Sequence, residues 1–486
     1  MTPPYIGGTV NNNLSSRRLE SYRNGGALYS TEVIMNIIIA GNGKVGSTLT
    51  RLLSAEGHDV TLIDTNSHVL EGSLEQYDVM AVSGNCACMN TLLQAGVREA
   101  DLLIAATNAD EINLLCCTTA HCLNPGLHTI ARIRDPEYIE QIYTMKDVFG
   151  LSMTINPEKQ AALEIAHLLQ YPGFLKRDTF AKGRTEIVEL RIDAASKLCN
   201  VALSDLNTVA KCRVLVCAVL RSGTAAAPKG SFVLREGDRI FVTAPAQNLT
   251  TLLRNLGIIT RRVRRVMLCG GGRLSFYLAS ELEKHGIGVQ ILEKSAERCQ
   301  ELAALLPNAV VIHGDSTDRT LLESEGLTKT DALVSLTGID ELNMITSLYG
   351  QSRGVPQVIT KLGRMENHAM IDALALGSVV CPKELCCNNI VRYVRAMQNQ
   401  AGAAVSVHRI AHGQVEAVEF LVDDTTLHCD TPLKNIRLKD NVLLASITHG
   451  SRTEIPGGDS SFTRGDTIVV VTSGQGTLRQ LNDIFA

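Results

Sequence analysis

The chain has 486 residues, and at roughly 100–200 residues per domain this length predicts three or four domains. Hydrophobic residues make up 45% and charged residues 20%, which excludes a disordered or fibrous protein and is typical of an α/β protein. The net charge of −4 gives no electrostatic reason to expect nucleic acid as a partner.

The N-terminal segment carries neither a secretory signal nor a membrane span. Its sequence, "MTPPYIGGTVNNNLSSRRLESYRNGG", is polar and lacks the apolar stretch of a signal peptide. The best apolar run elsewhere, "VLVCAVL" at 214–220, is far shorter than the roughly 18 residues that a membrane span needs. We expect residues 1–34 to form a flexible extension, with Met35 as an alternative natural start.

The next segment, from Met35 to about Leu151, alternates apolar strand-like runs with helical segments. The runs are "NIIIA", "DVTLID", "DVMAVSG", "DLLIAAT" and "HTIARI". This alternation predicts a doubly wound parallel sheet with helices on both faces. Pro157 then opens an amphipathic helix, and short β-rich runs at 186–192 and 239–242 indicate a small α+β domain.

The second half of the chain repeats the first. Gly41 and Gly270 are 229 residues apart, and "ATNADEIN" matches "LTGIDELN" at a spacing of 230. The likeness extends to the β-rich part, where "LREGDRIFV" resembles "TRGDTIVVV". The chain is therefore one two-domain module written twice. We predict nucleotide-binding domains at 35–152 and 263–381, connecting helices at 153–183 and 382–410, and small α+β domains at 184–260 and 411–486.

A glycine-rich turn follows the first predicted strand and opens the first helix. In such a turn the first glycine allows the tight bend, the second lets a pyrophosphate approach the backbone, and the third lets helix and strand pack closely. Asp64 ends the second strand, 23 residues after the first glycine, where an acid accepts the ribose hydroxyls and repels a 2′-phosphate. This pattern favours NAD over NADP at Gly41, Asn42, Gly43, Lys44, Val45, Gly46 and Asp64.

The second copy keeps part of this pattern. Ser275 stands in place of the third glycine, whereas Glu293 keeps the acid at the end of the second strand. We expect this site either to bind the adenosine end of a different nucleotide or to bind nothing. Its predicted residues are Gly270, Gly271, Gly272, Arg273, Leu274 and Glu293.

Further polar candidates follow the third, fourth and fifth strands, at the edge of the sheet where ligands bind in such folds. Two polar residues follow the third strand in each copy, and they could face an adenine or simply form a turn. At the fifth strand, a cation could reach a phosphate or be ion-paired. These candidates are Asn85 and Cys86, Thr107 and Asn108, and Arg132 in the first copy, and Asp315, Ser316 and Lys361 in the second.

Catalytic and metal sites are not predicted. No tyrosine has a lysine four residues on, and no nucleophile and base stand together in either small domain. The fourteen cysteines form no CxxC pair, so we expect them to be reduced and mostly buried, and the sequence gives no position for a redox-sensing thiol. An NAD-dependent oxidoreductase remains the alternative function. A DNA-binding repressor is disfavoured because no basic helix-turn-helix is evident.

These features together resemble the TrkA family of potassium uptake proteins. The resemblance rests on "MNIIIAGNGKVGSTLTRLLSAEGHDVTLID", "TNADEIN", "IARIRDPEY", "LREGDRIFV" and the duplication, and it covers nearly the whole chain from Met35. The chain departs from the family in Asn85, where an aspartate is usual, in Ser275 and in its N-terminal extension.

The resemblance implies two RCK halves, each with a nucleotide-binding domain and a smaller C-terminal domain. It also implies a cytoplasmic regulatory subunit that binds NAD(H) and adenine nucleotides, ATP or ADP among them. Such a subunit would assemble as a homo-oligomer, a dimer or a tetrameric ring, at the inner face of the plasma membrane. There it would gate a potassium channel or transporter subunit of the Trk type. The connecting helices are candidate levers, although plain packing within the chain also accounts for their apolar residues.

Overall fold

The computed structural model describes residues 34–170, 173–256, 262–363, 371, 374, 376–397, 404–473, 478 and 480–486. The expected flexible extension at 1–34 lies outside this range except for Ile34, which is exposed.

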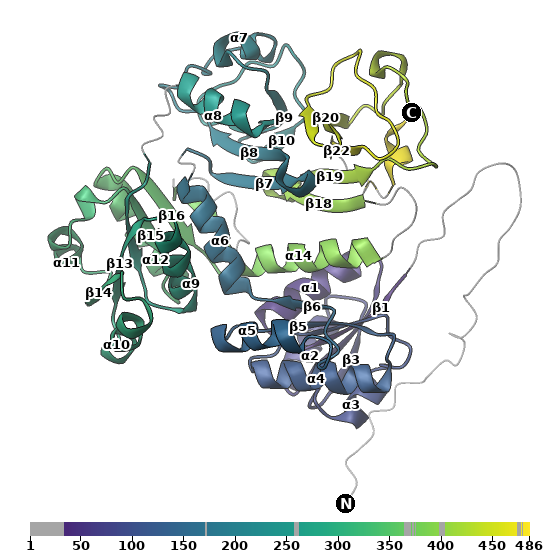
Figure 1. Cartoon of the computed structure of the whole chain (residues 1–486), viewed down its shortest axis with the longest axis vertical. Coiled ribbons are helices and arrows are strands. Elements are labelled where there is room, and N and C mark those ends of the chain that lie inside the picture. The colour runs from purple at the N-terminus through teal and green to yellow at the C-terminus, as the bar shows by residue number, and fades with distance from the viewer. Residues whose placement is uncertain are drawn as a thin grey trace, which may run out of the picture. The chain divides into compact units, whose positions relative to one another are not determined.

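The first half begins with a six-stranded sheet whose strand pairs are all parallel (Figure 1). The strand order is β3-β2-β1-β4-β5-β6, so the chain winds outward from β1 in both directions. This is the predicted doubly wound fold. Its elements are β1 (Asn36–Ala40), α1 (Lys44–Ala55), β2 (Asp59–Asp64), α2 (Ser67–Leu74), β3 (Met80–Ser83), α3 (Met89–Gln94), β4 (Leu102–Ala105), α4 (Asp110–Leu123), β5 (His128–Arg132), α5 (Pro136–Met145), β6 (Met153–Ile155) and α6 (Pro157–Gln170).

Alternate residues of β1 explain why both faces of this sheet are covered. Ile37 and Ile39 pack in one apolar core with α1, whereas Ile38 and Ala40 pack in another with α3 and α4. Successive side chains of a strand point to opposite faces, so a strand that is apolar at every position must be buried on both.

The second half repeats this sheet in the same order, β14-β13-β12-β15-β16-β17, again with parallel pairs only. The fold class predicted for both halves is thereby confirmed. The elements are β12 (Arg265–Cys269), α9 (Arg273–Lys284), β13 (Gly288–Glu293), α10 (Ala296–Leu305), β14 (Val310–His313), α11 (Arg319–Ser324), β15 (Ala332–Ser335), α12 (Asp340–Ser352), β16 (Gln357–Lys361), β17 (Ser378–Val380) and α14 (Pro382–Met397), with a 3₁₀ turn, η3, at Leu327–Lys329.

A five-stranded antiparallel sheet follows each parallel one, in the orders β10-β9-β11-β8-β7 and β18-β19-β22-β20-β21. The first small domain contains β7 (Lys176–Phe180), η1 (Ala181–Gly183), β8 (Thr185–Arg191), η2 (Leu203–Asp205), α7 (Leu206–Ala210), β9 (Leu215–Arg221), β10 (Thr224–Ala226), β11 (Arg239–Pro245) and α8 (Ala246–Asn255). The second contains β18 (Ala404–Ile410), η4 (Ala411–Gly413), β19 (Val415–Leu421), η5 (Leu433–Asn435), β20 (Val442–His449), β21 (Arg452–Glu454), β22 (Thr467–Thr472) and η6 (Leu481–Ile484).

The sequence predicts connecting segments that are helical throughout, but both also contain strands. The segment 153–183 holds β6 and β7 as well as α6, and 382–410 holds β18 after α14. Because β7 and β18 pair with β8 and β19, they belong to the antiparallel sheets. Both strands are polar at several positions, so neither forms the continuous apolar run by which a strand is predicted.

The two helices α6 and α14 are exchanged between the halves. Helix α6 of the first half packs against α9, and its residues Ile165 and Leu169 belong to the apolar core of the second parallel sheet. Helix α14 packs on α1, and Ile390 and Val394 belong to the core of the first (Figure 1). The helices therefore do more than link a nucleotide domain to its small domain: each completes the core of the other copy.

Polar contacts also hold the exchanged helices against the opposite halves. On α14, the guanidinium of Arg395 donates from Nη2 to Glu56 Oε1 at 2.6 Å, at the end of α1. On α6, the carbonyl of Leu168 accepts a hydrogen bond from Gln357 Nε2 at 2.9 Å, at the start of β16. A shared apolar cluster that includes Phe180, Phe241 and Val469 also joins the two antiparallel sheets. Within the described residues, no helix combines the length and apolarity needed to cross a bilayer.

Candidate nucleotide sites

The first glycine-rich turn has no room for side chains at two of its positions. Gly41 has φ +95°, and a Cβ there would lie 2.9 Å from the amide nitrogen of Thr107. A Cβ on Gly46 would lie 1.9 Å from the carbonyl oxygen of Gly41, which is closer than atoms can approach without movement of the backbone. The first and third glycines therefore act as the sequence predicts, by allowing the bend and the close packing of α1.

Helix α1 presents an open N-terminus at this turn. Gly43 is its N-cap and no side chain caps the helix. A Cβ on Gly43 would have no other atom within 4 Å, so a ligand can approach the backbone there. The first amides of a helix lack partners within the helix, and the positive end of its dipole favours an anion. The turn thus fits a pyrophosphate. Lys44 is exposed beside it, whereas Val45 is buried in the core, so only the backbone of Val45 can reach a ligand.

Asp64 is held at the end of β2 by two backbone amides. Its Oδ2 accepts from Asn42 N at 2.7 Å and its Oδ1 accepts from Asn66 N at 2.9 Å. The side chain of Asn42 donates in turn to Ser73 Oγ at 2.8 Å, which fixes the turn to α2. Each carboxylate oxygen keeps lone pairs for a further donor, so the group fits a ribose whose hydroxyls reach it.

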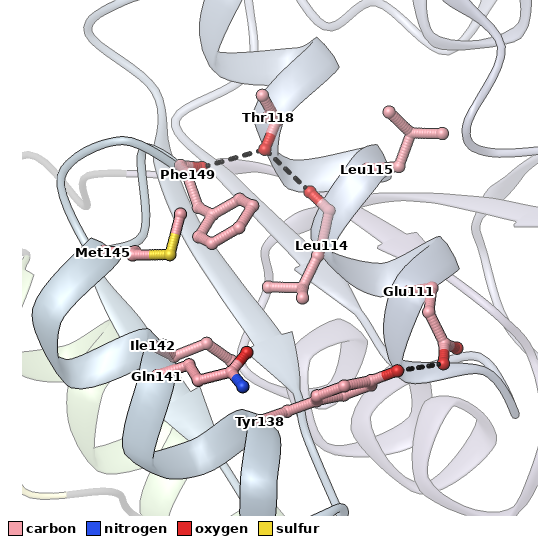
Figure 2. Close-up of a pocket in the computed structure, with 9 residues that line it drawn as sticks. All are labelled: Glu111, Leu114, Leu115, Thr118, Tyr138, Gln141, Ile142, Met145 and Phe149. Atoms are coloured by element: carbon pink, nitrogen blue, oxygen red, sulfur yellow. Dashed lines mark hydrogen bonds between the residues drawn. The ribbon is translucent and has the colours of Figure 1, made fainter.

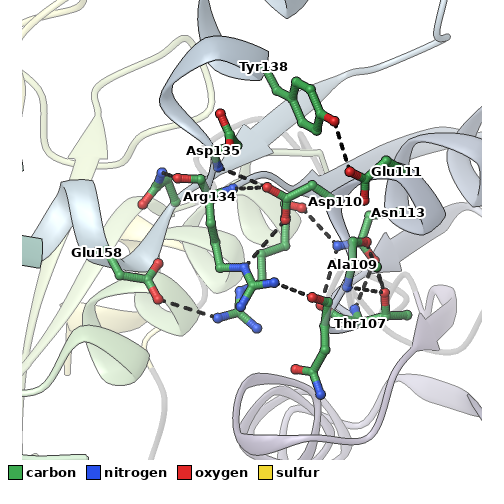
Figure 3. A network of polar contacts seen from close by, with 12 residues as sticks. Thr107, Ala109, Asp110, Glu111, Asn113, Arg134, Asp135, Tyr138 and Glu158 are labelled. Carbon is green, nitrogen blue, oxygen red and sulfur yellow. Dashed lines mark hydrogen bonds and ion pairs between the residues drawn. The ribbon is translucent and has the colours of Figure 1, made fainter. Parts of the chain in front are cut away.

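The loop after β4 closes the carboxyl edge of the first sheet (Figure 3). Asn113, fully buried, accepts through Oδ1 from Thr107 N at 2.9 Å and from Thr107 Oγ1 at 2.7 Å. Its Nδ2 donates to the carbonyl of Arg132 at 2.8 Å, which ties the ends of β4 and β5 together. Asn108 is left exposed. In the second copy Asn343 makes the same contacts with Thr337 and Lys361.

The two arginines at the end of β5 and just after it are ion-paired. Arg132 lies 3.6 Å from Glu158, between Nη2 and Oε1, and burial is the main reason that the pKa of its guanidinium is lowered. Its Nε is buried with no hydrogen-bond partner. Arg134 contacts Asp110 at 3.4 Å, between Nε and Oδ1, and donates to the carbonyl of Asn108 (Figure 3). Sequence alone gave no sign of Asp110 or Glu158, because neither belongs to the fingerprint.

The pair after β3 divides between a turn and the core. Asn85 Oδ1 accepts from Ala87 N at 3.0 Å, which is the turn-forming role weighed from the sequence. Cys86 is buried in the apolar core cluster that also holds Cys116 and Cys117 of α4. Its side chain is therefore directed away from the open turn, so the position could contact a ligand only through its backbone.

The second turn holds its acid in the same way. Glu293 accepts from Gly271 N at 2.6 Å and from Ser295 N at 2.7 Å. Gly272 caps α9 without a side-chain hydrogen bond, and the space beside it is empty to 4 Å. Ser275, fully buried where the first copy has Gly46, donates from Oγ to the carbonyl of Gly270. This hydrogen bond shows how the turn accepts a third residue other than glycine.

Two cations lie near the second turn. Arg298 on α10 donates from Nε to the carbonyl of Gly271 at 2.9 Å. Lys294 donates to Asp315 at 2.9 Å, and hydrogen bonds from Thr317 and then Lys294 lower the pKa of Asp315 to about 2. The first copy has the neutral residues Thr65 and Val69 at the places of Lys294 and Arg298.

The remaining predicted residues of the second copy lie at the same sheet edge. Lys361 donates from Nζ to the carbonyl of Thr337 at 2.9 Å, and burial lowers its pKa. Arg273 is exposed at the start of α9, whereas Leu274 and Ser316 are buried. The glycine-rich turn, Glu293 and Lys361 are thus brought to one edge, as the doubly wound topology requires.

Tyr277 connects the second copy to the first, a contact that the sequence does not predict. It lies on α9, one helical turn after Arg273, and its hydroxyl donates to the carbonyl of Arg134 at 2.8 Å. Asn156 donates to the same hydroxyl at 3.1 Å, and burial raises the pKa of Tyr277 to about 12. A contact between residues 143 positions apart leaves no mark in a single sequence.

An apolar groove of about 350 Å³ lies between α4 and α5 (Figure 2). On its rim Tyr138 donates to Glu111 at 2.9 Å. Its lining includes none of the predicted nucleotide-site residues and consists of Glu111, Leu114, Leu115, Thr118, Tyr138, Gln141, Ile142, Met145 and Phe149. Among the residues with described positions, no group of three or more His, Cys, Asp or Glu side chains is placed to hold a metal ion.

The chain is similar to known proteins over most of its length. The model of the TrkA-N domain matches residues 37–157 and 266–382, and the model of the TrkA-C domain matches 187–257. A Trk system potassium uptake protein TrkA homolog from Archaeoglobus fulgidus is 30% identical over 93% of this chain and 100% of its own length. The Trk system potassium uptake protein TrkA of Haemophilus influenzae is 28% identical over 93% of this chain and 98% of its own.

Solved structures share the fold at low identity. The GsuK RCK domain is 15% identical with a TM-score of 0.58, covering 93% of this chain and 96% of that one. The GsuK channel bound to NAD is 15% identical with a TM-score of 0.57, covering 92% and 78%. Three findings lead to one conclusion. They are the duplicated α/β fold, the acid that ends β2 and β13, and the relatives that match over nearly their full length. The chain belongs to the TrkA family and is a regulatory protein of potassium uptake with RCK domains, not an enzyme.

Proposed function

We propose that the first copy binds NAD(H), that the second binds ATP or ADP, and that the nucleotides bound at the two sites gate a Trk-type potassium-translocating partner in the membrane. The observation that carries this proposal is the uncapped N-terminus of α1 facing an acid that two amides hold in place. This pair of features suits a dinucleotide with an unmodified adenosine ribose.

The first site is proposed to prefer NAD(H) to NADP(H). Asp64 would accept the two ribose hydroxyls, whereas its charge would repel a 2′-phosphate. The neighbouring positions after β2, Thr65 and Asn66, carry no positive charge to offset that repulsion. We assign the phosphates to the amides of α1 and to Lys44, and the far end of the cofactor to the loop around Thr107 and Asn108.

The second site is proposed to take the more highly charged adenine nucleotides. Glu293 keeps a ribose acceptor, and the cations Lys294 and Arg298 stand beside it. Arg273 lies at the uncapped start of α9, where phosphates would bind. The cations near the turn thus favour a polyphosphate over a neutral ligand, although Asp315 and Glu301 offset part of their charge.

Tyr277 provides a route by which the two sites could sense each other. A nucleotide at the start of α9 would bind one helical turn before Tyr277, whose hydroxyl contacts the Arg134 carbonyl. Arg134 in turn contacts Asp110 and Asn108 in the first copy. Ligands coupled in this way change each other's affinity by the same factor, because linkage is reciprocal.

Self-association and a membrane partner complete the proposal. We expect the chain to form a homo-oligomer at the inner face of the membrane, with the groove between α4 and α5 as the contact surface. Leu115, which lines the groove, is 55% exposed, and Val148, next to the lining residue Phe149, is 71% exposed. Exposed apolar side chains that gather in this way favour an association site. Replacing Leu115 by lysine should lower the oligomeric state in sedimentation velocity, while nucleotide binding is retained.

Nucleotide binding to the full chain is the first test. Calorimetry should give one NAD(H) per chain, with Asp64→Asn weakening that binding about 10- to 100-fold and Glu293→Gln leaving it unchanged. Potassium flux through vesicles that contain the partner and this chain should then change with NADH, NAD, ATP or ADP. Identical flux under all four nucleotides and without nucleotide would refute the gating role.

The coupling route is tested separately with Tyr277→Phe, which removes only the hydroxyl that contacts Arg134. In the native chain, ATP should shift the NADH affinity several-fold, and in the variant this shift should shrink while each separate affinity stays close to its native value. An undiminished shift would show that the communication passes elsewhere.

A further inference from the structure

The second parallel sheet carries exposed cations at the edge where its strands begin. Because β12, β13, β14 and β15 are parallel, the residues that precede them meet at this edge, opposite the edge where a nucleotide is proposed to bind. We call it the basic edge. Its exposed basic residues are Arg262, Arg264, Arg265, Lys284, His285 and Lys329.

The acids near the basic edge are less exposed and already hold other groups. Asp331 accepts from the backbone amides of Arg264 and Arg265, at 2.8 and 3.0 Å, so its charge is used on the start of β12. Glu281 pairs with Lys284 at 2.9 Å. All the acids at or beside this edge are only partly exposed, and they are Glu281, Glu283, Glu323, Glu325 and Asp331.

Several cations of the basic edge are left for an outside partner. Within the part of the chain that the structure describes, the side chains of Arg264, Arg265 and Lys329 make no ion pair or hydrogen bond. All three are exposed to solvent. The charge at this edge is therefore positive on its outer surface, which favours an anionic partner.

The internal repeat shows that the fold does not need these cations. Asp101 of the first copy accepts from Asn36 N at 2.8 Å, just as Asp331 accepts from Arg265 N. The acid that holds the strand is thus common to both copies, whereas the cations are not. At the spacings of 229 and 230 between the copies, the residues in place of Arg264, Arg265 and Lys329 are Met35, Asn36 and Glu99.

Two exposed apolar side chains lie at the same edge. Leu305 ends α10 and Val310 begins β14, and they are 57% and 59% exposed. Strand β14 pairs with β13, which pairs with β12, so these side chains lie on the strands next to the arginines. A surface that offers both cations and apolar side chains matches the boundary between lipid headgroups and acyl chains. An acidic polypeptide would use the charges alone.

We propose that the basic edge docks on an anionic phospholipid surface, with the arginines on lipid phosphates and with Leu305 and Val310 among the headgroups. A guanidinium suits this contact because its planar fork matches a phosphate. Each exposed Arg or Lys near an anionic membrane raises the affinity about 5-fold. Neither a bound nucleotide nor the potassium-translocating partner is needed for this contact, although the membrane location follows the function proposed above.

The contact is tested by cosedimentation of the full chain with lipid vesicles. One set contains phosphatidylcholine alone, and the other contains about one third phosphatidylglycerol. Affinity should be about 100-fold higher for the anionic vesicles at about 0.1 M salt. It should fall steeply towards 1 M salt, because the Debye length shrinks from about 10 Å to about 3 Å. Equal affinity for the two sets, or binding that does not respond to salt, would overturn the proposal.

Exchanges with the first copy identify the residues responsible. Arg264→Met with Arg265→Asn copies the first half and should weaken binding to the anionic vesicles about 25-fold, and Arg264→Met alone about 5-fold. The charge-matched control is Arg98→Thr, which removes an exposed cation from the corresponding edge of the first sheet and should leave the affinity unchanged. Thermal melting checks that each variant is folded. Native affinity in the folded double variant would overturn the assignment.

Poly-glutamate distinguishes a membrane from an acidic polypeptide. Leu305→Ser should weaken binding to anionic vesicles several-fold and leave poly-glutamate binding unchanged, because a soluble polyanion gains nothing from an apolar side chain. Binding of poly-glutamate without binding of vesicles would identify an acidic polypeptide as the partner and overturn the proposal. The vesicles contain neither a channel subunit nor a nucleotide, so failure of this test leaves the proposed function standing, and the reverse also holds.

Discussion

The two glycine-rich turns perform the same structural task with different chemistry. In the first copy, the Asn42 side chain ties the turn to α2 and a true glycine stands at position 46. In the second, Gly271 has no side chain, and Arg298 reaches back from α10 to hold the turn, while Ser275 bonds to the carbonyl of Gly270. The acid at the end of the second strand is held by two amides in both.

This comparison teaches that the acid and the open helix N-terminus are the features common to both copies. The contacts around them differ: those in the first copy are largely neutral, and those in the second are cationic. The first turn has all three glycines of the fingerprint, whereas the second has Ser275 at the third position. Each substitution that exchanges residues between the copies therefore tests which differences matter for ligand choice.

The largest effect is expected from Gly46→Ser, which places the residue of the second turn in the first. The new Cβ would meet the Gly41 carbonyl at 1.9 Å, so the turn must move, and NADH binding at the first site should be lost. The reverse exchange, Ser275→Gly, removes a hydrogen bond and should cost only about 1 kcal/mol of stability. Calorimetry measures NADH binding and thermal melting measures stability in each variant. Equal losses of stability in Gly46→Ser and Ser275→Gly would contradict the difference between the turns.

Because α6 and α14 are exchanged between the halves, shortening a buried side chain on either helix should destabilise the opposite half. Ile165 of α6 and Ile390 of α14 are equivalent positions, and both are fully buried. Ile390→Ala should destabilise the first parallel domain, and Ile165→Ala the second, by about 2–5 kcal/mol each. Hydrogen exchange resolved by peptide should show the loosened sheet in the half opposite to the mutated helix. Loosening of the mutated helix's own half would contradict the exchange.

A smaller effect is expected from removing the charge of the first acid. Asp64→Asn should lower NAD affinity about 10- to 100-fold, since a hydrogen bond to a charged group is worth about 1.5–3 kcal/mol. It should also narrow the preference for NAD over NADP, because the repulsion of a 2′-phosphate is removed. Glu293→Gln is the matched control and should leave the NAD titration unchanged. An unaltered NAD-to-NADP ratio in Asp64→Asn would argue against ribose recognition by this acid.

The smallest effect concerns Glu164 on α6, whose equivalent on α14 is a neutral residue. Burial, and then Asp178, raises the pKa of Glu164 to about 7, and Lys176 and Arg177 oppose this shift. Because the pKa in the folded chain lies above its ordinary value of 4.5, the stability contribution is full below about pH 4.5 and is lost as pH rises to about 7. Glu164→Gln should therefore melt with the native chain at pH 4.5 and about 2–4 °C higher at pH 8.

The equivalent position on α14 gives the control for this pH dependence. It holds the neutral Asn389, so Asn389→Gln should shift the melting temperature equally at both pH values. The difference in melting temperature between Glu164→Gln and the native chain should grow from pH 4.5 to 8. A constant difference would show that Glu164 does not titrate in this range.

Much of the fold could be predicted because its signals are local. Strand β1 is apolar at successive positions, the glycines mark the turn, and the repeat fixes both halves at once. Asp64 and Glu293 were identified by their distance from the glycines, and the structure places both beside the turns as expected.

The features that escaped prediction depend on contacts between distant segments. Tyr277 reaches the carbonyl of Arg134 across 143 positions. The exchange of α6 and α14 was also invisible, because an amphipathic helix shows that it has an apolar face but not which surface covers it. Strands β7 and β18 were missed for the related reason that pairing, not hydrophobicity, defines them.

The exchange of the connecting helices bears on how the chain can be divided. A fragment that ends after α8 would retain α6 with Ile165 and Leu169 uncovered, and its first sheet would lack the cover of α14. The complementary fragment would have the opposite defect. Neither piece alone is expected to remain monomeric and compact, but co-expressed pieces have matching deficits and should recombine. The molecule is therefore suited to a split-reporter design in which reassembly itself is the signal.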